Sequence, residues 1–507
     1  MDLWNSVLLG FSISLEPINL FYCFMGVLMG TLIGVLPGIG PVATISILLP
    51  ATFKMSPISG IIMLAGIYYG AMYGGSTTSI LVNIPGEAAS VVTCLDGYQM
   101  ARKGRAGPAL GISAFGSFIA GTFAVVALTL LAPPLAEVAL QLGPPEYFSL
   151  VILGFTLLAY LAHGSMIKAL MMACIGLIMA CIGLDFISGF ERFTYGIATL
   201  EDGIGLVPVA MGVFGIGEVL INLEESIGKR EVFKAKISNL LPSLKDWKDS
   251  LLPIIRGSVL GFFLGILPGG GAVIASFTSY AVEKRFSKHP QEFGQGAIEG
   301  VAGPEAANNA GAGGNFIPLM TLGIPANPVM ALMMGALVIH GLQPGPLLLS
   351  QNPDVFWGVI VSMYLGNIML LILNLPLIGI WIRVLRIPYP FLFPLILLFC
   401  LIGSYSIGNN KFDVLIMSLF GVIGYLLRKI RFEAAPMLLA MVLGPMLEDA
   451  LRQSLIMSGG SFTIFLVRPF SLAFIGLAAI LTAFPIIKWI LGKKTRLAAE
   501  LPKEDHS

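Results

Sequence analysis

Charged residues are scarce in this chain. Asp, Glu, Lys and Arg make up 11% of its 507 residues, hydrophobic residues make up 56%, and the mean hydropathy is +0.89. A soluble chain of this length needs far more polar surface than this composition offers. Apolar runs of about 20 residues recur from end to end, which predicts an integral membrane protein with many spanning helices. The net charge is only +1, and no basic patch favours nucleic-acid binding.

Cysteine and histidine are also few, and the common catalytic motifs are absent from the sequence. The five cysteines lie singly, mostly inside apolar runs, and predict neither a disulfide framework nor a metal site. The four histidines are dispersed, and no HExxH, GxSxG or P-loop pattern occurs. We therefore expect a protein that is not an enzyme and that holds no cofactor and no transition metal. No Lys or Arg precedes Lys54, so the N-terminus lacks the charged region of a secretory signal.

Glycine, in contrast, is abundant at 60 residues, and much of it belongs to a motif that occurs twice. The first copy is "GVLMGTLIGVLPGIGPV" at 26–42, and the second is "GSVLGFFLGILPGGGAV" at 257–273. In a helix interior Gly costs roughly 1 kcal/mol and Pro about 3 relative to Ala, so an apolar segment needs a reason to contain them. The GxxxGxxxG part is typical of helices that pack closely in lipid. The LPGxG part predicts a turn.

A second motif follows each copy of the first and is also duplicated. The stretch "GGSTTSILVNIPGE" at 74–87 is echoed by "GGNFIPLMTLGIPAN" at 313–327. The chain therefore divides into two related halves, 1–230 and 231–470. A final segment, 471–507, supplies one more transmembrane helix and a polar tail. Internal duplication of this kind is typical of secondary transporters.

The distribution of basic residues predicts that the two halves are inverted. Lys and Arg cluster in 102–105, 229–256, 284–288, 383–386, 428–431 and 493–496. The positive-inside rule places these segments, and with them the C-terminus, in the cytoplasm. The loop at 102–105 corresponds to 340–343 in the second half, which has no Lys or Arg. Equivalent loops thus face opposite sides of the membrane, while the side of the N-terminus stays open.

Each LPGxG motif is expected at the tip of a re-entrant hairpin. Basic segments flank the second copy on both sides, and at about 1.5 Å per residue its second arm is too short to cross a ~30 Å core. Non-helical backbone at this depth is tolerated only where protein or a water-filled cavity surrounds it. We therefore predict an all-α, polytopic membrane protein of two inverted repeats, each with a re-entrant hairpin and a broken helix. About 10–12 transmembrane helices are expected in all.

The tips and the broken helices are the candidate binding elements. Consecutive glycines beside a helix N-terminus suit an anion, unless their amides are bonded to neighbouring protein. Carbonyl, hydroxyl and amide oxygens of a broken helix suit Na⁺, unless they only cap or join helices. The residues expected to bind substrate are Pro37, Gly38, Gly40, Ser76, Thr77, Asn83, Pro85, Gly86, Pro268, Gly269, Gly270, Gly271, Pro325 and Asn327. Those expected to bind a coupling cation are Thr78, Glu87, Asn308, Asn309, Asn315 and Thr321.

Two acidic residues, Glu87 and Glu305, lie beside these motifs. Glu87 and Glu305 are candidates for function because an acidic side chain at membrane depth is rare and costly. The alternative is that each lies at the interface and only starts a helix. Asp96 is close in sequence to Arg102 and Arg105, and we expect it to be a surface charge.

With these residues in view, the sequence resembles the large membrane subunit of the tripartite tricarboxylate transporters. The resemblance covers nearly the whole chain. It is carried by "GTLIGVLPGIGPVATI", "YYGAMYGGSTTSILVNIPGEAASVVTCLDGYQMARKGRAGPALG", "GFFLGILPGGGAVIASF" and "NFIPLMTLGIPANPVMALMMGAL". The two halves differ at one point, because the first reads Asn-Ile-Pro-Gly-Glu where the second reads Gly-Ile-Pro-Ala-Asn.

The resemblance implies import of di- or tricarboxylates, such as citrate, by symport with Na⁺ or H⁺ in a bacterial inner membrane. It also implies two partners, a periplasmic solute-binding protein and a small membrane subunit of about four helices. An anion moving inward works against about 2.3 kcal/mol per charge per 100 mV, which also favours cation coupling. The alternative is a passive organic-anion channel or an exporter that needs no binding protein. The carboxylate, the cation, an elevator or a rocking motion, and the oligomeric state stay open.

Overall fold

The structure is a computed structural model that describes residues 2–36, 40–161, 165–185, 187–225, 240–269, 271–385 and 389–483. Within these residues the chain is almost entirely helical. One two-stranded antiparallel ribbon, β1 (Gly183–Leu184) and β2 (Glu191–Arg192), pairs Gly183 with Arg192. Seven of the described helices are long and apolar enough to cross a membrane, and several shorter apolar helices accompany them. The prediction of an all-α polytopic membrane protein is confirmed.

The helices alternate along the chain with short connections. The first half contains α1 (Leu3–Ser14), α2 (Pro17–Val35), α3 (Gly40–Thr52), α4 (Pro57–Val82), η1 (Ala88–Ser90), α5 (Val91–Arg102), α6 (Ala106–Ala139), α7 (Pro144–Leu161), α8 (Met166–Ala180), η2 (Ala198–Leu200), α9 (Leu206–Ala210), η3 (Met211–Ile216) and α10 (Gly217–Glu225). The second half contains α11 (Leu244–Ile266), α12 (Gly271–Phe286), η4 (Pro290–Glu292), α13 (Glu299–Gly314), α14 (Phe316–Leu322), α15 (Pro328–Ile339), α16 (Pro346–Gln351), α17 (Pro353–Asn374), α18 (Ile378–Val384), α19 (Tyr389–Gly408), α20 (Lys411–Lys429), α21 (Ala435–Met457) and α22 (Ile464–Val467). A last apolar helix covers Pro469–Ala483. The predicted tail lies outside the described residues.

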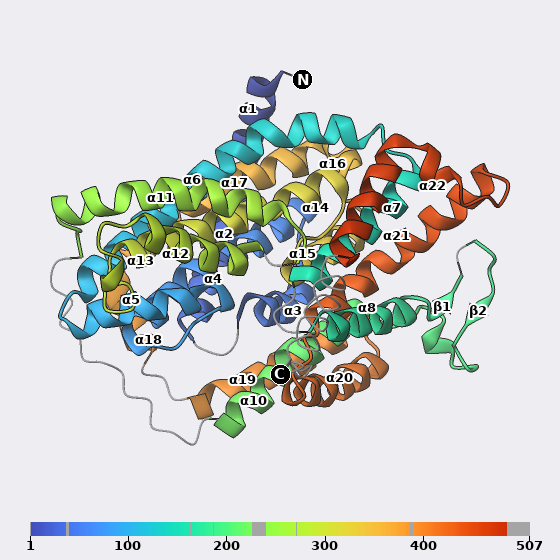
Figure 1. Ribbon diagram of the computed structural model, residues 1–507. Helices are drawn as coiled ribbons and strands as arrows, with labels where there is room; N and C mark the ends of the chain where they lie inside the picture. The colour runs from blue at the N-terminus through green and yellow to red at the C-terminus, as the bar shows by residue number, and fades with distance from the viewer. Residues whose placement is uncertain are drawn as a thin grey trace, which may run out of the picture.

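The helices gather into two bundles (Figure 1). In the first bundle α2 packs on α4, α11 packs on α13, and α6 and α17 join these pairs. In the second bundle α8 and α7 pack on α21, and η3 packs on α20. Two helices link the bundles, because α3 contacts both α4 and α19, and α15 contacts both α4 and α21. The boundary between the bundles therefore includes α3 and α15.

The glycine ladders explain the closest helix pairs of the first bundle. A Cβ atom built on Gly30 of α2 would lie 2.4 Å from the Ile67 carbonyl oxygen of α4. A Cβ atom on Gly261 of α11 would lie 2.3 Å from the Ala307 carbonyl oxygen of α13. Backbones that approach this closely leave no room for a side chain, so only glycine fits. The prediction that the ladders serve helix packing is confirmed in both halves.

The segments that follow the two LPGxG motifs pack differently. Helix α12 returns along α11 and also lies against α13, so it stays within the first bundle. Helix α3 does not return closely along α2. It packs on α4 and reaches α19 and η3 of the second bundle. The second-half segment is thus a compact hairpin, whereas the first-half segment is more open.

Asp96 of α5 is buried, so the prediction of a surface charge is wrong. The side chain has no exposed surface. One carboxylate oxygen accepts hydrogen bonds from the backbone N–H groups of Gly294, Gly296 and Ala297 at 2.7–2.9 Å. The other accepts one from the Tyr280 hydroxyl at 2.8 Å. The loop before α13 folds over α5 and turns its amides toward this charge, a tertiary contact that neighbouring arginines in the sequence do not reveal.

Candidate binding site

The two broken helices share one construction. Asn83 follows the last residue of α4 with φ 59°, and Gly323 follows the last residue of α14 with φ 69°. Both breaks therefore begin with a residue in the left-handed conformation. Glycine adopts this conformation without strain, and asparagine is among the residues that tolerate it. After each Ile-Pro pair, Glu87 caps η1 and Asn327 caps α15 by accepting a backbone N–H at 2.6 and 2.9 Å. Asn83 is therefore the counterpart of Gly323, and Glu87 is the counterpart of Asn327.

A cavity of about 470 Å³ lies between the two bundles, bordered by both breaks and by both glycine tips. From the first bundle and its links it is lined by Gly40, Pro41, Val42, Ala43, Tyr68, Met72, Pro85, Gly86, Glu87, Ala88, Gly269, Gly271, Ala272, Val273, Asn327, Pro328 and Val329. From the second bundle it is lined by Leu158, Phe214, Glu218, Arg428, Glu433, Ala435 and Pro436. A mostly apolar cavity with a few convergent polar groups is the usual form of a small-molecule site.

Several helices begin at this cavity. Gly40 is the first residue of α3, Gly271 the first of α12, and Pro328 the first of α15. Ala88 begins η1, which leads directly into α5. The first N–H groups of a helix lack partners within it, and its N-terminus carries roughly half a positive charge. These N-termini add positive potential to a cavity whose lining holds Arg428 and the carboxyl groups of Glu87, Glu218 and Glu433.

Not every tip amide is available for a ligand. The N–H of Gly269 donates to the Ala326 carbonyl at 2.9 Å, and φ at Gly269 is 110°. This bond ties the α11–α12 tip to the second break. The interpretation of a tip amide bonded to neighbouring protein therefore holds at Gly269.

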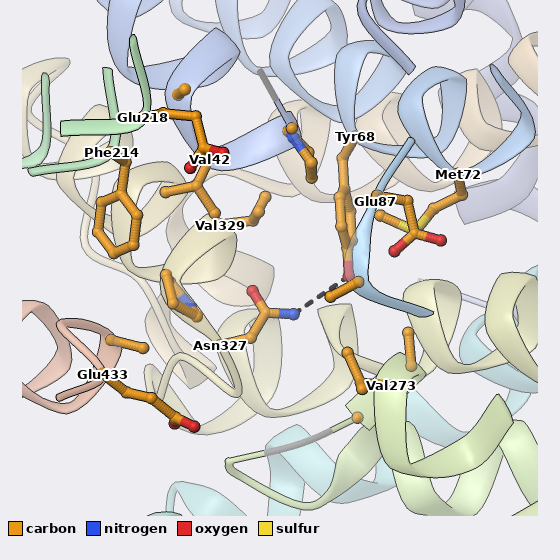
Figure 2. A pocket seen from close by; sticks show the side chains of 18 of the residues that line it. Val42, Tyr68, Met72, Glu87, Phe214, Glu218, Val273, Asn327, Val329 and Glu433 are labelled. Carbon is orange, nitrogen blue, oxygen red and sulfur yellow. Dashed lines mark hydrogen bonds between the residues drawn. The ribbon is translucent and has the colours of Figure 1, made fainter. Parts of the chain in front are cut away.

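Tyr68 of α4 is the best-positioned hydroxyl of the cavity (Figure 2). Its oxygen accepts hydrogen bonds from the side-chain amides of Asn315 at 2.8 Å and Asn327 at 3.1 Å. Since the oxygen accepts two bonds, its own hydrogen remains to be donated to a further acceptor. In this arrangement the hydrogen can be donated to a ligand carboxylate in the cavity. A half-turn of the Asn315 amide, whose buried Oδ1 has no partner among the described residues, would let that oxygen accept it instead.

Glu87 borders the cavity beside Tyr68 (Figure 2). Asn308 of α13 donates to its Oε1 at 3.0 Å, and the Ala89 N–H donates to its Oε2. Glu305, one turn earlier on α13, lies behind the cavity and is 1% exposed. The hydroxyls of Ser76 and Thr93 donate to its two carboxylate oxygens. Both predicted acidic candidates are thus buried between helices.

The residues that line the cavity from the second bundle were not predicted as part of the site. Arg428 of α20 forms an ion pair with Glu218 of α10, and both line the cavity. Phe214 projects from η3, a stretch of π-helix that interrupts the span 206–225. Such π-helical turns are frequent at functional sites. Glu218, a charge inside the apolar stretch 204–222, was a signal that the sequence offered, whereas Arg428 was assigned to a cytoplasmic basic cluster.

The predicted site residues separate into three groups. Those that line the cavity are Gly40, Pro85, Gly86, Glu87, Gly269, Gly271 and Asn327. Those that lie outside its lining are Ser76, Thr77, Thr78, Asn83, Pro268, Asn308, Asn309, Asn315, Thr321 and Pro325. Pro37, Gly38 and Gly270 lie outside the described residues.

Several polar residues outside the lining have structural partners. Thr78 donates to the Val35 carbonyl at 2.8 Å, and Thr321 donates to the carbonyl one turn earlier at 2.8 Å. Asn309 donates to the Ser117 hydroxyl at 2.7 Å. Among the described residues, no group of three or more His, Cys, Asp or Glu side chains could hold a metal ion.

A multi-pass helical chain with a cavity between two bundles, at the breaks of two helices, has the architecture that many membrane transport proteins share. The family described as "Tripartite tricarboxylate transporter TctA family" matches residues 20–439, and the chain belongs to it. The resemblance found in the sequence is thereby confirmed, and the protein is a subunit of a tripartite tricarboxylate transporter.

Two relatives come from Agrobacterium vitis, and neither carries a described activity. An "uncharacterized 52.8 kDa protein in TAR-I ttuC' 3'region" is 53% identical over 502 residues, which cover 99% of each chain. An "uncharacterized protein in TAR-II ttuC' 3'region" is 52% identical over 240 residues, which cover 47% of this chain and 99% of the relative. No solved structure matches the chain.

Proposed function

We propose that this subunit is the membrane pathway of a secondary active transporter that imports di- or tricarboxylates by cation symport. The substrate site is the cavity between the bundles. A carboxylate group would meet the first turns of α3, α12 and α15 and accept the hydrogen of the Tyr68 hydroxyl. Asn327 would hold that hydroxyl in place.

The convergence of helix N-termini on one cavity is the observation that carries this proposal. Each N-terminus acts as roughly +0.5 of an elementary charge, so three of them offset about 1.5 negative charges. Arg428 is already paired with Glu218, so a second source of positive potential is needed for an anion with two or more charges. Helix dipoles supply it without a strongly hydrated ammonium group.

The position of the cavity between bundles suits alternating access. Its lining comes from elements of both bundles, so a displacement of one bundle against the other would expose it to either side in turn. The similar packing of α2 with α4 and of α11 with α13 supports the division into repeats at 1–230 and 231–470. We infer that these repeats are inverted in the membrane, and that the motion is of the elevator or the rocking type.

We also infer the remaining parts of the system. The chain would lie in a bacterial inner membrane with its C-terminus in the cytoplasm, and would act as a carrier and not as an enzyme. A periplasmic solute-binding protein would deliver the carboxylate, and a small membrane subunit would complete the complex. No cofactor is required, and Na⁺ or H⁺ would be the coupling ion because inward movement of an anion opposes the membrane potential.

Uptake into liposomes tests the proposal. The full chain, reconstituted with its small membrane subunit and supplied with the binding protein, should accumulate radiolabelled succinate, malate or citrate. Accumulation should require an inward Na⁺ or H⁺ gradient and should be absent from protein-free liposomes. Flux that continues without either gradient and without the binding protein would establish the alternative, a passive organic-anion channel or exporter.

A further inference from the structure

We propose that Glu305 and Glu87 form the proton-binding site that couples transport to the H⁺ gradient. This inference rests on the proposed function and selects H⁺ as the ion. Glu87 borders the cavity and would exchange protons with it. Glu305, enclosed behind it on α13, would hold the proton while the bundles move.

The surroundings of Glu305 provide no positive charge. Its carboxylate is held by the hydroxyls of Ser76 on α4 and Thr93 on α5, and no ion pair to it occurs among the described residues. A buried carboxylate without a cation is costly unless a proton neutralises it or strong hydrogen bonds compensate. Hydroxyl groups suit both cases, because each can donate to an ionised carboxylate or accept from a protonated acid.

Ser76 is arranged to satisfy both protonation states of Glu305. Its oxygen contacts Glu305 Oε2 and also lies 3.2 Å from the Met72 carbonyl. A serine has one hydrogen, so it cannot donate to both acceptors at once. When Glu305 is ionised, Ser76 donates to it. When Glu305 is protonated, the acid donates to Ser76, and Ser76 donates to the Met72 carbonyl.

Asn308 can likewise bond Glu87 in either of its protonation states. Its Nδ2 donates to Glu87 Oε1 at 3.0 Å, while its Oδ1 is buried and has no hydrogen-bond partner. Asn308 has no exposed surface, so water does not readily satisfy this oxygen. Rotation of the amide by half a turn would aim Oδ1 at Glu87, where it could accept the hydrogen of a protonated acid. The Asn308 amide can therefore bond either the ionised or the protonated form of Glu87.

The packing around Glu305 favours a proton over Na⁺. Hydroxyls of Ser76 and Thr93 touch the carboxylate directly, and Ser113 supplies a third hydroxyl beside it, so its partners are groups that can exchange hydrogen bonds with a protonated acid. Glu305 does not line the cavity of about 470 Å³. A proton needs no such space, because it is carried within an existing hydrogen bond.

Other titratable groups near this pair are few or already satisfied. Those closest to Glu305 from the packed elements are Glu87, Tyr73 of α4 and Cys94 of α5. The Tyr73 hydroxyl donates to Asn367 at 2.6 Å. On neighbouring helices, Asp96 is held by backbone amides, and Glu283 is paired with Arg256. None of these groups supplies a permanent positive charge to Glu305.

The test compares Glu305→Gln, Glu87→Gln and Ser76→Ala with a control, Glu137→Gln, whose side chain is exposed on α6. Liposomes contain the full chain with its partner subunits and a pH-sensitive dye. Two processes are measured with whichever of succinate, malate or citrate the wild type carries. The first is exchange of labelled for unlabelled substrate, which needs no net proton movement. The second is accumulation driven by a pH gradient, with acidification of the lumen.

We expect Glu305→Gln to retain exchange but to lose accumulation, so that internal and external substrate concentrations become equal. Retained exchange shows that this variant is folded. Glu87→Gln, which alters the lining of the cavity itself, should also lose accumulation driven by the pH gradient. Ser76→Ala should still accumulate substrate but with a shifted pH profile, because the carboxyl remains and only its switching partner is lost. Glu137→Gln should match the wild type. Normal accumulation by Glu305→Gln, or accumulation that needs Na⁺ and ignores the pH gradient, would overturn the inference.

A second measurement separates this inference from the proposed function. If the wild type carries no carboxylate, the proposed function fails, but the proton site can still be assessed by infrared titration of the purified full chain. The site predicts a carboxylic-acid C=O band that varies with pH, is lost in Glu305→Gln and is kept in Glu137→Gln. An unchanged band in Glu305→Gln would refute the proton site independently of transport.

Discussion

Replacement of Gly261 by alanine tests the packing on which the first bundle depends. The new Cβ atom would lie 2.3 Å from the Ala307 carbonyl oxygen and 2.6 Å from the Ala307 Cα atom. Both are backbone atoms of α13 and cannot turn aside as a flexible side chain would. An ordinary contact begins at 3.4 Å, so α11 must retreat from α13 by about 1 Å.

The cost follows from the contacts that this retreat weakens. A gap of up to 1 Å forfeits a quarter to a half of a contact worth about 0.15 kcal/mol, so roughly 50 atom pairs between the helices lose about 2–4 kcal/mol. Alanine returns about 1 kcal/mol through its higher helix propensity. Gly261→Ala should therefore destabilise the protein by about 1–3 kcal/mol and lower its Tm in detergent.

Gly154 of α7 is the matched control. A Cβ atom at this helical position meets nothing within 4 Å, so Gly154→Ala keeps the propensity gain and adds no clash. Its Tm should be unchanged or higher than that of the wild type. If Gly261→Ala unfolds at the same temperature as Gly154→Ala, the glycine at 261 does not determine how closely α11 packs on α13, and the packing argument is refuted.

Two further predictions concern the cavity and the ribbon. Tyr68→Phe removes the acceptor of two buried amides and should raise the substrate concentration for half-maximal uptake about tenfold, equivalent to ~1.4 kcal/mol. Tyr69→Phe is its control, because the Tyr69 hydroxyl is buried without a partner, and equal effects of the two changes would contradict the assignment. In the ribbon, hydrogen bonds from Ser188 and Arg452 lower the pKa of Asp185 below its usual value. This pairing stabilises the fold fully above the unfolded pKa of about 3.9 and is lost as pH falls toward the lowered folded value. Hydrogen exchange of residues 183–192, corrected for intrinsic rates, should show protection declining only below that pH, and Asp185→Asn should abolish the pH dependence; protection that is unchanged in acid would refute the role of this ion pair.

The fold class and part of the site could be predicted because their signals are local. A duplicated glycine ladder specifies close helix packing, and a duplicated Ile-Pro break specifies where a helix must end. These constraints act within a few residues, so Gly40, Gly86, Gly271 and Asn327 could be named as binding residues before any contact was known. Glu87 was named as a cation ligand for the same reason, and the structure adds that it lines the same cavity.

The rest of the site depends on contacts between distant segments. The aligned motifs already pair Asn83 with Gly323 and Glu87 with Asn327, but only the structure shows that Asn327 lines the cavity while Asn83 lies outside it. The cavity wall from the second bundle contains Phe214, Glu218 and Arg428. The helices that carry these residues lack the duplicated Ile-Pro break, so that motif does not mark them in the sequence.

By itself the sequence determined that this is a membrane protein of helices, built twice from the same motifs and belonging to a family of carboxylate transporters. Composition, periodicity and backbone-breaking residues are enough for the membrane helices and the duplication, because each acts through local chain chemistry or through lipid as a solvent, while the family follows from the resemblance of the quoted motifs. Only the tertiary structure decided which groups share the cavity and that Asp96 is buried under a loop. Burial and proximity are properties of packed segments that lie hundreds of residues apart, and no local pattern encodes them.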